Sequence, residues 1–179
     1  FILNVNGKDI LVDPGSFVYT SDPTLRNQFR SVLSHNTLFW DGLEPRNLDE
    51  GLFKLNEIGN VKIESILGGK SELFFRGRYD YKRRYHQRSL SINSAERRID
   101  IKDKASHEDA KLRFNFSPEN IIEKTSDGFI VDSVSFNFDS VRDLELQDSL
   151  FSPSYGQVQS TKSIDVFLDG LSIDYQISY

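Results

Sequence analysis

The amino-acid sequence predicts an all-β protein, a large antiparallel β-sandwich of several sheets (a super-sandwich) with more than ten strands. In many short segments apolar and polar residues alternate with a period of two, as they do in strands with one buried face. Turn residues, chiefly Gly with Asn or Asp, separate these segments. Phe and Tyr, which favour strands, account for 14 and 7 of the 179 residues.

The first predicted element is a β-hairpin. Phe1–Val5 and Asp9–Val12 flank Asn6-Gly7, the dipeptide type that most strongly favours a two-residue hairpin turn. Asp13-Pro14-Gly15 ends the second strand, because Pro and Gly both interrupt a strand ladder. An apolar-rich run, Phe17–Thr20, follows this turn.

A short helix and a strand are predicted next. Leu25–Leu33 is the best helical candidate in this half of the chain, with room for only a turn or two. Asn36–Trp40 has the apolar character of a strand, and Asp41-Gly42 closes it.

The rest of the chain is predicted to be strands at short spacing. They are Gly51–Leu55, Asn60–Leu67, Glu72–Arg76, Arg83–Asn93, Arg97–Lys102, Ala110–Phe116, Asn120–Lys124, Gly128–Val131, Ser133–Phe138, Asp143–Gln147, Lys162–Leu168 and Ser172–Ser178. Gly68-Gly69, Asp127-Gly128 and Asp169-Gly170 supply turns between some of them. Because no linker or fixed repeat interrupts the pattern, we predict one domain over residues 1–179.

Composition excludes several classes of partner. A net charge of −5 gives no basic surface for nucleic acid, and no apolar stretch is long enough to cross a membrane as a helix. The absence of Cys rules out disulfides and thiolate metal sites. The chain contains no Met and opens on an apparent strand, so we expect it to be part of a longer protein.

Asp13 and His35 are the first candidate site residues. Asp13 follows the apolar run Ile10-Leu11-Val12, which suggests burial, and a buried carboxylate needs a cation, backbone N–H groups or a metal as partner. The alternative for Asp13 is a cap over the Pro14-Gly15 turn. His35 lies just before an apolar strand, at a position where a sheet can present ligands at its rim. None of the three histidines, His35, His86 and His107, stands in a zinc-binding spacing with another.

The densest basic cluster lies in the middle of the chain. It consists of Arg76, Arg78, Arg83, Arg84 and Arg88. Such a cluster contacts sulfate or carboxylate groups in some proteins, and in others it is a solvated strand face.

Several motifs resemble the heparinase II/III-like domain of bacterial polysaccharide lyases. The motifs are Asn4-Val5-Asn6-Gly7, Asp9 to Gly15 with Tyr19, Arg30-Ser31, Ser34-His35-Asn36-Thr37-Leu38 and Asp41-Gly42, with looser matches at Tyr85-His86-Gln87-Arg88 to Asp100 and at Ser152-Pro153-Ser154-Tyr155-Gly156. The resemblance spans most of the chain and is most specific over residues 4–42.

The resemblance implies a fold and an activity. Such enzymes join an N-terminal α/α toroid to a C-terminal β-sandwich, and they cleave uronic-acid-containing polysaccharides such as heparan sulfate or alginate by β-elimination. The resemblance implies that this chain is the β-sandwich domain of a periplasmic or secreted lyase. Its partners would be an acidic polysaccharide and the toroid of the same protein.

The resemblance also implies site residues. Asp13 and His35 match two ligands of a structural zinc, whose first His lies upstream of Phe1, so we expect zinc in the full-length protein and not in this chain alone. Arg76, Arg78, Arg88 and His86 are expected to contact the acidic sugar. The catalytic Tyr and the group that neutralises the substrate carboxylate belong to the toroid, so the catalytic residues lie mostly elsewhere and this chain alone is expected to be inactive.

Two other functions remain open. The chain is alternatively a non-catalytic carbohydrate-binding or scaffold module of a lyase-like protein in exopolysaccharide metabolism. A plain β-sandwich adhesin or assembly domain would bind neither metal nor sugar, and would make the Asp13 and His35 match a coincidence.

Overall fold

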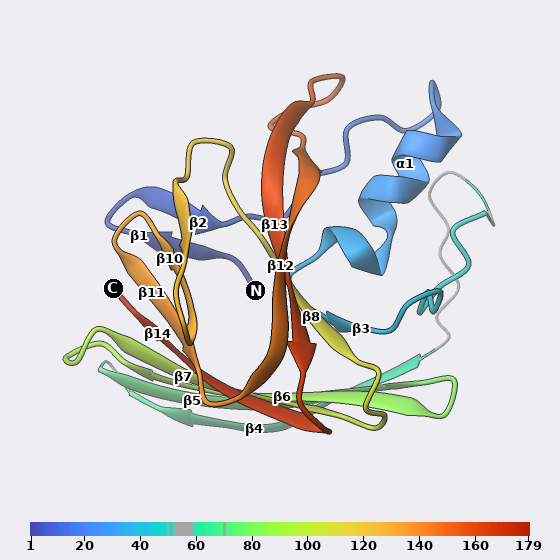
Figure 1. Ribbon diagram of the computed structural model, residues 1–179. Helices are drawn as coiled ribbons and strands as arrows, with labels where there is room; N and C mark the ends of the chain where they lie inside the picture. Colours follow the sequence, from blue (N-terminus) through green and yellow to red (C-terminus); the bar gives the residue numbers. More distant parts are fainter. Residues whose placement is uncertain (50, 52–58, 70) are drawn as a thin grey trace. The chain divides into compact units, whose positions relative to one another are not determined.

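A computed structural model describes residues 1–49, 51, 59–69 and 71–179 (Figure 1). Within these residues fourteen strands form three sheets in which strands pair antiparallel, with one α-helix and one 3-10 turn. The prediction of an all-β, multi-sheet antiparallel protein with more than ten strands is confirmed. The predicted strand Gly51–Leu55 falls mainly outside the described residues. No helix in the described part has the length and apolar character needed to cross a membrane.

The chain divides into two compact units. The first unit comprises residues 1–58, 111–120 and 145–166, and the second comprises residues 59–110, 121–144 and 167–179. Two of the boundaries fall inside strands β12 (Val141–Phe151) and β13 (Gln159–Leu168), which therefore contribute residues to both units. The prediction of a single domain stays a prediction.

The first unit opens with the predicted hairpin. Strands β1 (Leu3–Val5) and β2 (Lys8–Leu11) pair across Asn6 and Gly7, whose φ angles of 53° and 85° are those of a type I′ turn. Gly7 suits this turn because it adopts a positive φ without a steric penalty. The Asn4 side chain supports the turn by accepting a hydrogen bond from the Gly7 amide at 3.0 Å.

The first unit also contains the helix. Helix α1 (Pro23–Arg30) starts at Asp22, whose side chain accepts a hydrogen bond from the Leu25 amide at 2.9 Å, and Pro23 fits the first helical turn. The helix ends at Ser31, where a 3-10 turn (Val32–Ser34) takes over. The predicted helical segment is thus an α-helix followed by a separate tight turn.

A four-stranded sheet supplies the core of the first unit. Its order is β12-β13-β8-β3, with β8 at Lys111–Asn115 and β3 reduced to Leu38–Phe39, shorter than predicted. The buried side chains are aliphatic and aromatic, and the largest of them include Phe39, Trp40, Phe114 and Phe116. Burying such large apolar groups is the main driving force for this unit.

The second unit is built on one eight-stranded sheet in the order β4-β5-β6-β7-β14-β11-β10-β9. The strands are β4 (Gly59–Gly68), β5 (Glu72–Tyr81), β6 (Arg84–Asn93), β7 (Arg98–Ala105), β9 (Ile122–Lys124), β10 (Gly128–Val131), β11 (Val134–Phe138) and β14 (Ser172–Ser178). Side chains alternate between two faces. Ile99, Ile101, Ile173 and Ile177 lie on a buried apolar face, whereas the residues between them form a polar face.

Strand β4 forms one edge of this sheet and exposes apolar side chains. Val61 is 72% exposed, Ile63 66%, Ile66 58% and Leu67 64%. Lys62 and Glu64 alternate with the first two, so the predicted period-two pattern is present. These apolar side chains are therefore exposed and not part of the hydrophobic core.

Candidate functional site

The structure brings Asp13 and His35 together just beyond the end of β2. Nδ1 of His35 lies 2.8 Å from Oδ2 of Asp13, although 22 positions separate the two residues. The other carboxylate oxygen, Oδ1, accepts a hydrogen bond from the Gly15 amide at 3.2 Å. One carboxylate therefore caps the turn, as the alternative for Asp13 predicted, and also binds the imidazole; its role as a metal ligand stays a prediction.

The expected burial of Asp13 is wrong. Its side chain is 58% exposed and that of His35 is 38% exposed, although Leu11 and Val12 are buried. The physical reason is that the chain turns at Pro14-Gly15, so the first residue beyond the buried strand reaches the surface. The hydrogen bond with His35 nevertheless holds the pKa of Asp13 below its ordinary value, against the opposing effect of partial burial.

Asn36 fixes the position of its neighbour His35. Its buried amide donates to the Val12 carbonyl at 2.9 Å and to the Phe1 carbonyl at 3.0 Å, and its Oδ1 accepts from the Asn115 amide at 2.6 Å. These bonds tie the end of β2 to β8. Sequence patterns assigned Asn36 no role of its own, although a buried amide next to an apolar strand needs several hydrogen-bond partners.

Gly15 allows a second loop to approach this turn. Its φ is +80°, and a Cβ atom there would lie 2.4 Å from the Ser152 carbonyl oxygen. The Ser152 amide donates to the Pro14 carbonyl at 2.8 Å. Ser152 begins the late Ser-Pro-Ser-Tyr-Gly motif, which therefore packs against the turn that carries Asp13.

A pocket of about 350 Å³ opens beside the Asp13–His35 pair. Arg30, Arg46 and Glu44 also line it. Glu44 is engaged locally, since it accepts hydrogen bonds from the Val32 amide at 3.1 Å and from the Ser31 hydroxyl. Burial and the nearby Arg26 guanidinium lower the pKa of Arg30, which still remains charged near neutral pH. Two arginines thus line a pocket large enough for a small anionic group.

The four residues predicted to bind sugar do not converge. Arg76 and Arg78 pair across β5 and β6 with Ser89 and Gln87, whereas His86 and Arg88 pair with Tyr79 and Gly77. Because side chains alternate along a strand, the first two arginines lie on the polar face and His86 and Arg88 on the apolar face. The role of these four residues in substrate binding stays a prediction. Because they lie on opposite faces of the sheet, they cannot all contact one sugar unit.

On the apolar face, His86 and Arg88 surround the buried carboxylate of Asp103. Arg88 donates to its two oxygens at 2.8 and 3.0 Å, His86 Nε2 lies 2.6 Å from Oδ1, and the Tyr175 hydroxyl donates to Oδ2 at 3.0 Å. The Asp103 side chain has no exposed surface. Sequence reasoning missed Asp103 and Tyr175. The available signal was the phase of the strand, because Asp103 continues the buried positions of Ile99 and Ile101.

On the polar face, Arg78 binds Asp80 and stacks on Tyr85. Its Nε lies 2.9 Å from Asp80 Oδ1, and its guanidinium carbon lies 3.9 Å from the centre of the Tyr85 ring. Arg76 donates to the Ser89 hydroxyl at 3.0 Å and packs over Phe74. Both guanidinium groups are therefore held in fixed positions at the surface.

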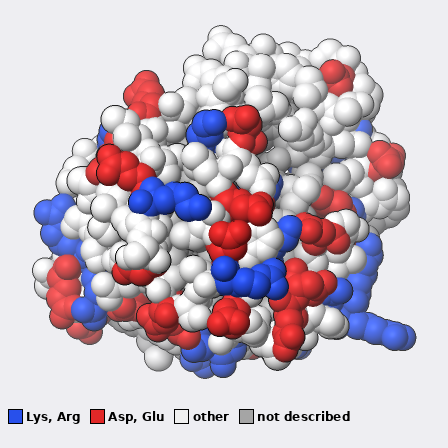
Figure 2. Space-filling view, in the orientation of Figure 1, with Lys and Arg blue, Asp and Glu red and all other residues white. Residues whose placement is uncertain are grey.

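Charges of both signs are interspersed on the face seen in Figure 2. Lys and Arg side chains lie next to Asp and Glu across that face, in agreement with the small net charge of −5. On this face an anionic ligand would therefore be recognised by local groups and not by a broad positive field.

Comparisons with known proteins identify the family. The family model described as "Heparinase II/III-like, C-terminal" matches residues 1–176. No curated protein sequence matches the chain significantly. Asp13, His35 and the elements that position them all lie within the matched region.

Solved structures show the fold. A heparan sulfate lyase HepC from Pedobacter heparinus superposes with a TM-score of 0.76 at 15% identity, covering 99% of this chain and 29% of that protein. A heparinase III superposes with a TM-score of 0.70 at 16% identity, covering 96% of this chain and 28% of that protein. The chain therefore spans less than a third of the length of these enzymes. The likeness confirms the β-sandwich class, and the family match shows that the chain belongs to the heparinase II/III-like C-terminal family.

Proposed function

We propose that this chain is the C-terminal β-sandwich domain of a polysaccharide lyase that cleaves a uronic-acid-containing polysaccharide by β-elimination. The observation that carries the proposal is the family match over residues 1–176. The similar solved structures are those of a heparan sulfate lyase and a heparinase III, so an acidic polysaccharide is the proposed substrate class. The proposed location is periplasmic or secreted, where such a polymer is accessible.

The chemistry of β-elimination defines what this domain would contribute. The proton to be removed lies next to a carboxylate, whose negative charge must be neutralised before the proton becomes acidic. A base then takes the proton and an acid protonates the departing oxygen. Arg30 and Arg46 line the pocket beside His35, and their positive charges are suited to holding a sulfate or carboxylate of the polymer. We assign the base and the acid to the proposed N-terminal toroid.

The Asp13–His35 pair fits part of a zinc site. An imidazole nitrogen and a carboxylate oxygen are ordinary zinc ligands, and the two atoms are already adjacent, so a zinc ion would take the place of the proton that they share. Among the described residues no three His, Asp or Glu side chains gather as a metal site, so further ligands would have to come from elsewhere. Bound zinc would supply a cross-link between the turn after β2 and the residue before β3.

Activity of the full-length protein tests the proposal. β-Elimination creates an unsaturated uronate, so absorbance in the ultraviolet follows the reaction on heparan sulfate, chondroitin and alginate. We expect the full-length protein to turn over one of these polymers and residues 1–179 alone to turn over none. Arg46→Ala should lower the rate of turnover at low substrate concentration. Arg97→Ala, in a turn of the second unit, should leave this rate unchanged.

Inactivity of the full-length protein on all of these polymers would overturn the lyase proposal. Retained binding to the same polymers would then support the non-catalytic carbohydrate-binding or scaffold module. For the metal, elemental analysis should find zinc in the full-length protein and a loss of it in His35→Ala. Equal zinc content in the two proteins would contradict the assignment of His35.

A further inference from the structure

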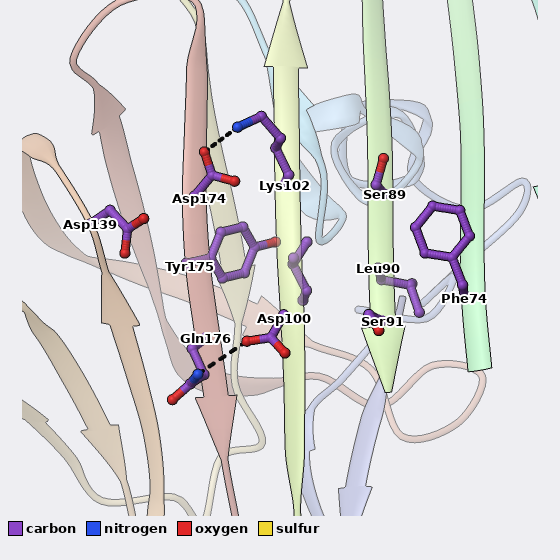
Figure 3. Close-up of a pocket in the computed structure, with 11 residues that line it drawn as sticks. Phe74, Ser89, Leu90, Ser91, Asp100, Lys102, Asp139, Asp174, Tyr175 and Gln176 are labelled. Atoms are coloured by element: carbon purple, nitrogen blue, oxygen red, sulfur yellow. Dashed lines mark hydrogen bonds and ion pairs between the residues drawn. The ribbon is translucent and has the colours of Figure 1, made fainter. Parts of the chain in front are cut away.

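A groove runs along the polar face of the eight-stranded sheet, and two cross-strand rows form it. In the first row Phe74, Ser91, Asp100 and Gln176 are paired in turn across β5, β6, β7 and β14. In the second row Arg76, Ser89, Lys102 and Asp174 are paired in the same way, and of these four only Arg76 lies outside the groove lining. Each row therefore has a serine between longer side chains. The two serines form the floor, as Figure 3 shows between Phe74 and the side chains of β7 and β14.

The groove has the size and the wall of a sugar subsite. Its volume is about 280 Å³, at the lower end of the range for small-ligand pockets and enough for roughly one sugar ring. Phe74 forms one wall and is half-buried, so its ring is held in place, with the Arg76 guanidinium 5.4 Å from the ring centre. An aromatic wall offers an apolar surface to the C–H groups of a sugar ring.

The polar groups of the groove are held in position before any ligand arrives. Gln176 donates to Asp100 at 3.0 Å, Lys102 forms an ion pair with Asp174, and Arg76 donates to Ser89. The Ser89 hydroxyl, which accepts from Arg76, can still donate its own proton, and carboxylates accept hydrogen bonds from hydroxyl groups. Side chains that are already fixed lose little entropy when a ligand binds.

The charge of the lining selects the kind of sugar. Asp100, Asp139 and Asp174 line the groove against one lysine, Lys102. Arg98 and Arg76 both lie outside the lining, where Arg98 donates to Asp100 at 2.9 Å and Arg76 donates to Ser89 at 3.0 Å. The lining itself is acidic, so a sulfate or carboxylate placed in it would be repelled, whereas uncharged hydroxyl groups would find several acceptors.

We propose that this groove binds an uncharged sugar unit of a polysaccharide, as a second carbohydrate site separate in chemistry from the arginine-lined pocket beside His35. The proposal goes beyond lyase activity and does not require it. Its ligand class differs from the acidic polymer proposed for the lyase reaction. A protein with both sites would hold uncharged stretches of a chain at the groove.

Binding measurements on the full-length protein test the proposal. The probes are uncharged oligosaccharides of glucose, mannose and N-acetylglucosamine, with a heparin oligosaccharide as the charged comparison, and calorimetry and amide chemical shifts report binding without turnover. We expect at least one uncharged probe to bind and to shift the amides of β6 and β7. Ser91→Trp fills the groove and should weaken this binding by roughly tenfold or more. Ser135→Trp, on the same face but outside the lining, should leave it unchanged.

Two further variants keep the test decisive. Ser91→Asn is a smaller change that should still weaken binding if the tryptophan variant fails to fold. Phe74→Ala should weaken binding through loss of the aromatic wall. The proposal is overturned if no uncharged probe binds, if both Ser91 variants bind as the wild type does, or if heparin competes at the groove. If the full-length protein shows no lyase activity but still binds an uncharged probe at the groove, only the lyase proposal is contradicted.

Discussion

Asp103 is a buried carboxylate to which three other side chains form hydrogen bonds. Burial alone would raise its pKa, but the charges of Arg88 and His86 and their hydrogen bonds outweigh this cost and hold the pKa of Asp103 well below its ordinary value. The same carboxylate raises the pKa of Arg88, and burial raises that of Tyr175. Asp103 and Arg88 are therefore both ionised at neutral pH, and the hydrogen bonds to Asp103 join β6, β7 and β14 from within the apolar face.

Replacing Asp103 with Asn should destabilise the protein strongly. The change leaves the Arg88 charge buried without its counter-ion, which typically costs about 3–5 kcal/mol of unfolding free energy. Asp100→Asn is the matched control, since Asp100 lies on the polar face of the same strand with its side chain 46% exposed and should change stability by no more than about 1 kcal/mol. Urea unfolding near neutral pH measures both. Equal losses would contradict this account of the cluster.

The Asp103 contribution should also depend on pH. A carboxylate whose pKa is lower in the folded state stabilises the protein above its unfolded pKa of about 3.9, and this stabilisation disappears as the pH falls through the lower folded value. The stability gap between wild type and Asp103→Asn should therefore stay constant above about pH 5 and narrow on further acidification. Urea midpoints across the acid range measure the gap. A gap that widens toward low pH would be inconsistent with a depressed pKa.

Sequence patterns located the Asp13–His35 pair but not the residues that position it. The motif match placed the two side chains in one site, and they lie 2.8 Å apart. The burial of Asp13 was wrong because apolar neighbours in a strand say nothing about the direction of the turn that follows. Asp103 was missed for a related reason, since a period-two pattern indicates which face a residue occupies and not which partners meet it there.

At the scale of elements, the sequence predicts turns well, whereas the ends of strands depend on packing against neighbouring strands. Asn6-Gly7 and the strands beside it followed from sequence. The lengths of β3, β5 and β12 did not, because strand ends depend on the neighbouring strand, which a single sequence does not identify. Strand β5 extends to Tyr81 across polar residues that its partner β6 keeps paired.

The turn at Gly15 should tolerate substitution less well than a turn in open space. Gly15→Ala introduces both positive-φ strain and a contact of 2.4 Å with the Ser152 carbonyl. Gly42→Ala is the control, since Gly42 has a φ of +67° with nothing within 4 Å of the added carbon. We expect a loss of about 1 kcal/mol for Gly42→Ala and clearly more, up to about 3 kcal/mol, for Gly15→Ala. Thermal unfolding distinguishes them, and similar losses would refute a role for the Ser152 contact.

Strand β4 should make residues 1–179 prone to self-association when they are produced alone. An exposed edge strand with several apolar side chains offers unpaired backbone groups and apolar area to another molecule. Ile63→Lys should reduce light scattering at high concentration with little change in stability, because Ile63 is 66% exposed. Ile101→Lys, at a buried position on β7, should unfold the protein. Unchanged scattering in Ile63→Lys would exclude β4 as the site of association.

At the scale of the whole molecule, neither unit is a continuous piece of chain. The first unit takes residues from three separate segments and so does the second, and β12 and β13 each contribute to both. Local alternation predicted the strands and the all-β class. It did not reveal this division, because the assignment of strands to units depends on contacts between residues far apart in sequence.

The position of β14 has a consequence for how the protein is made. This strand, Ser172–Ser178, pairs with β7 on one side and β11 on the other, so the interior of the eight-stranded sheet depends on residues that leave the ribosome after all the other strands. Until then, β7 and β11 present open edges during synthesis at about 5–20 residues per second, a state in which partly folded chains are vulnerable to misassembly. We therefore expect the eight-stranded sheet to close only after β14 has been synthesised, and a chaperone that shields the open edges of β7 and β11 would act before that step.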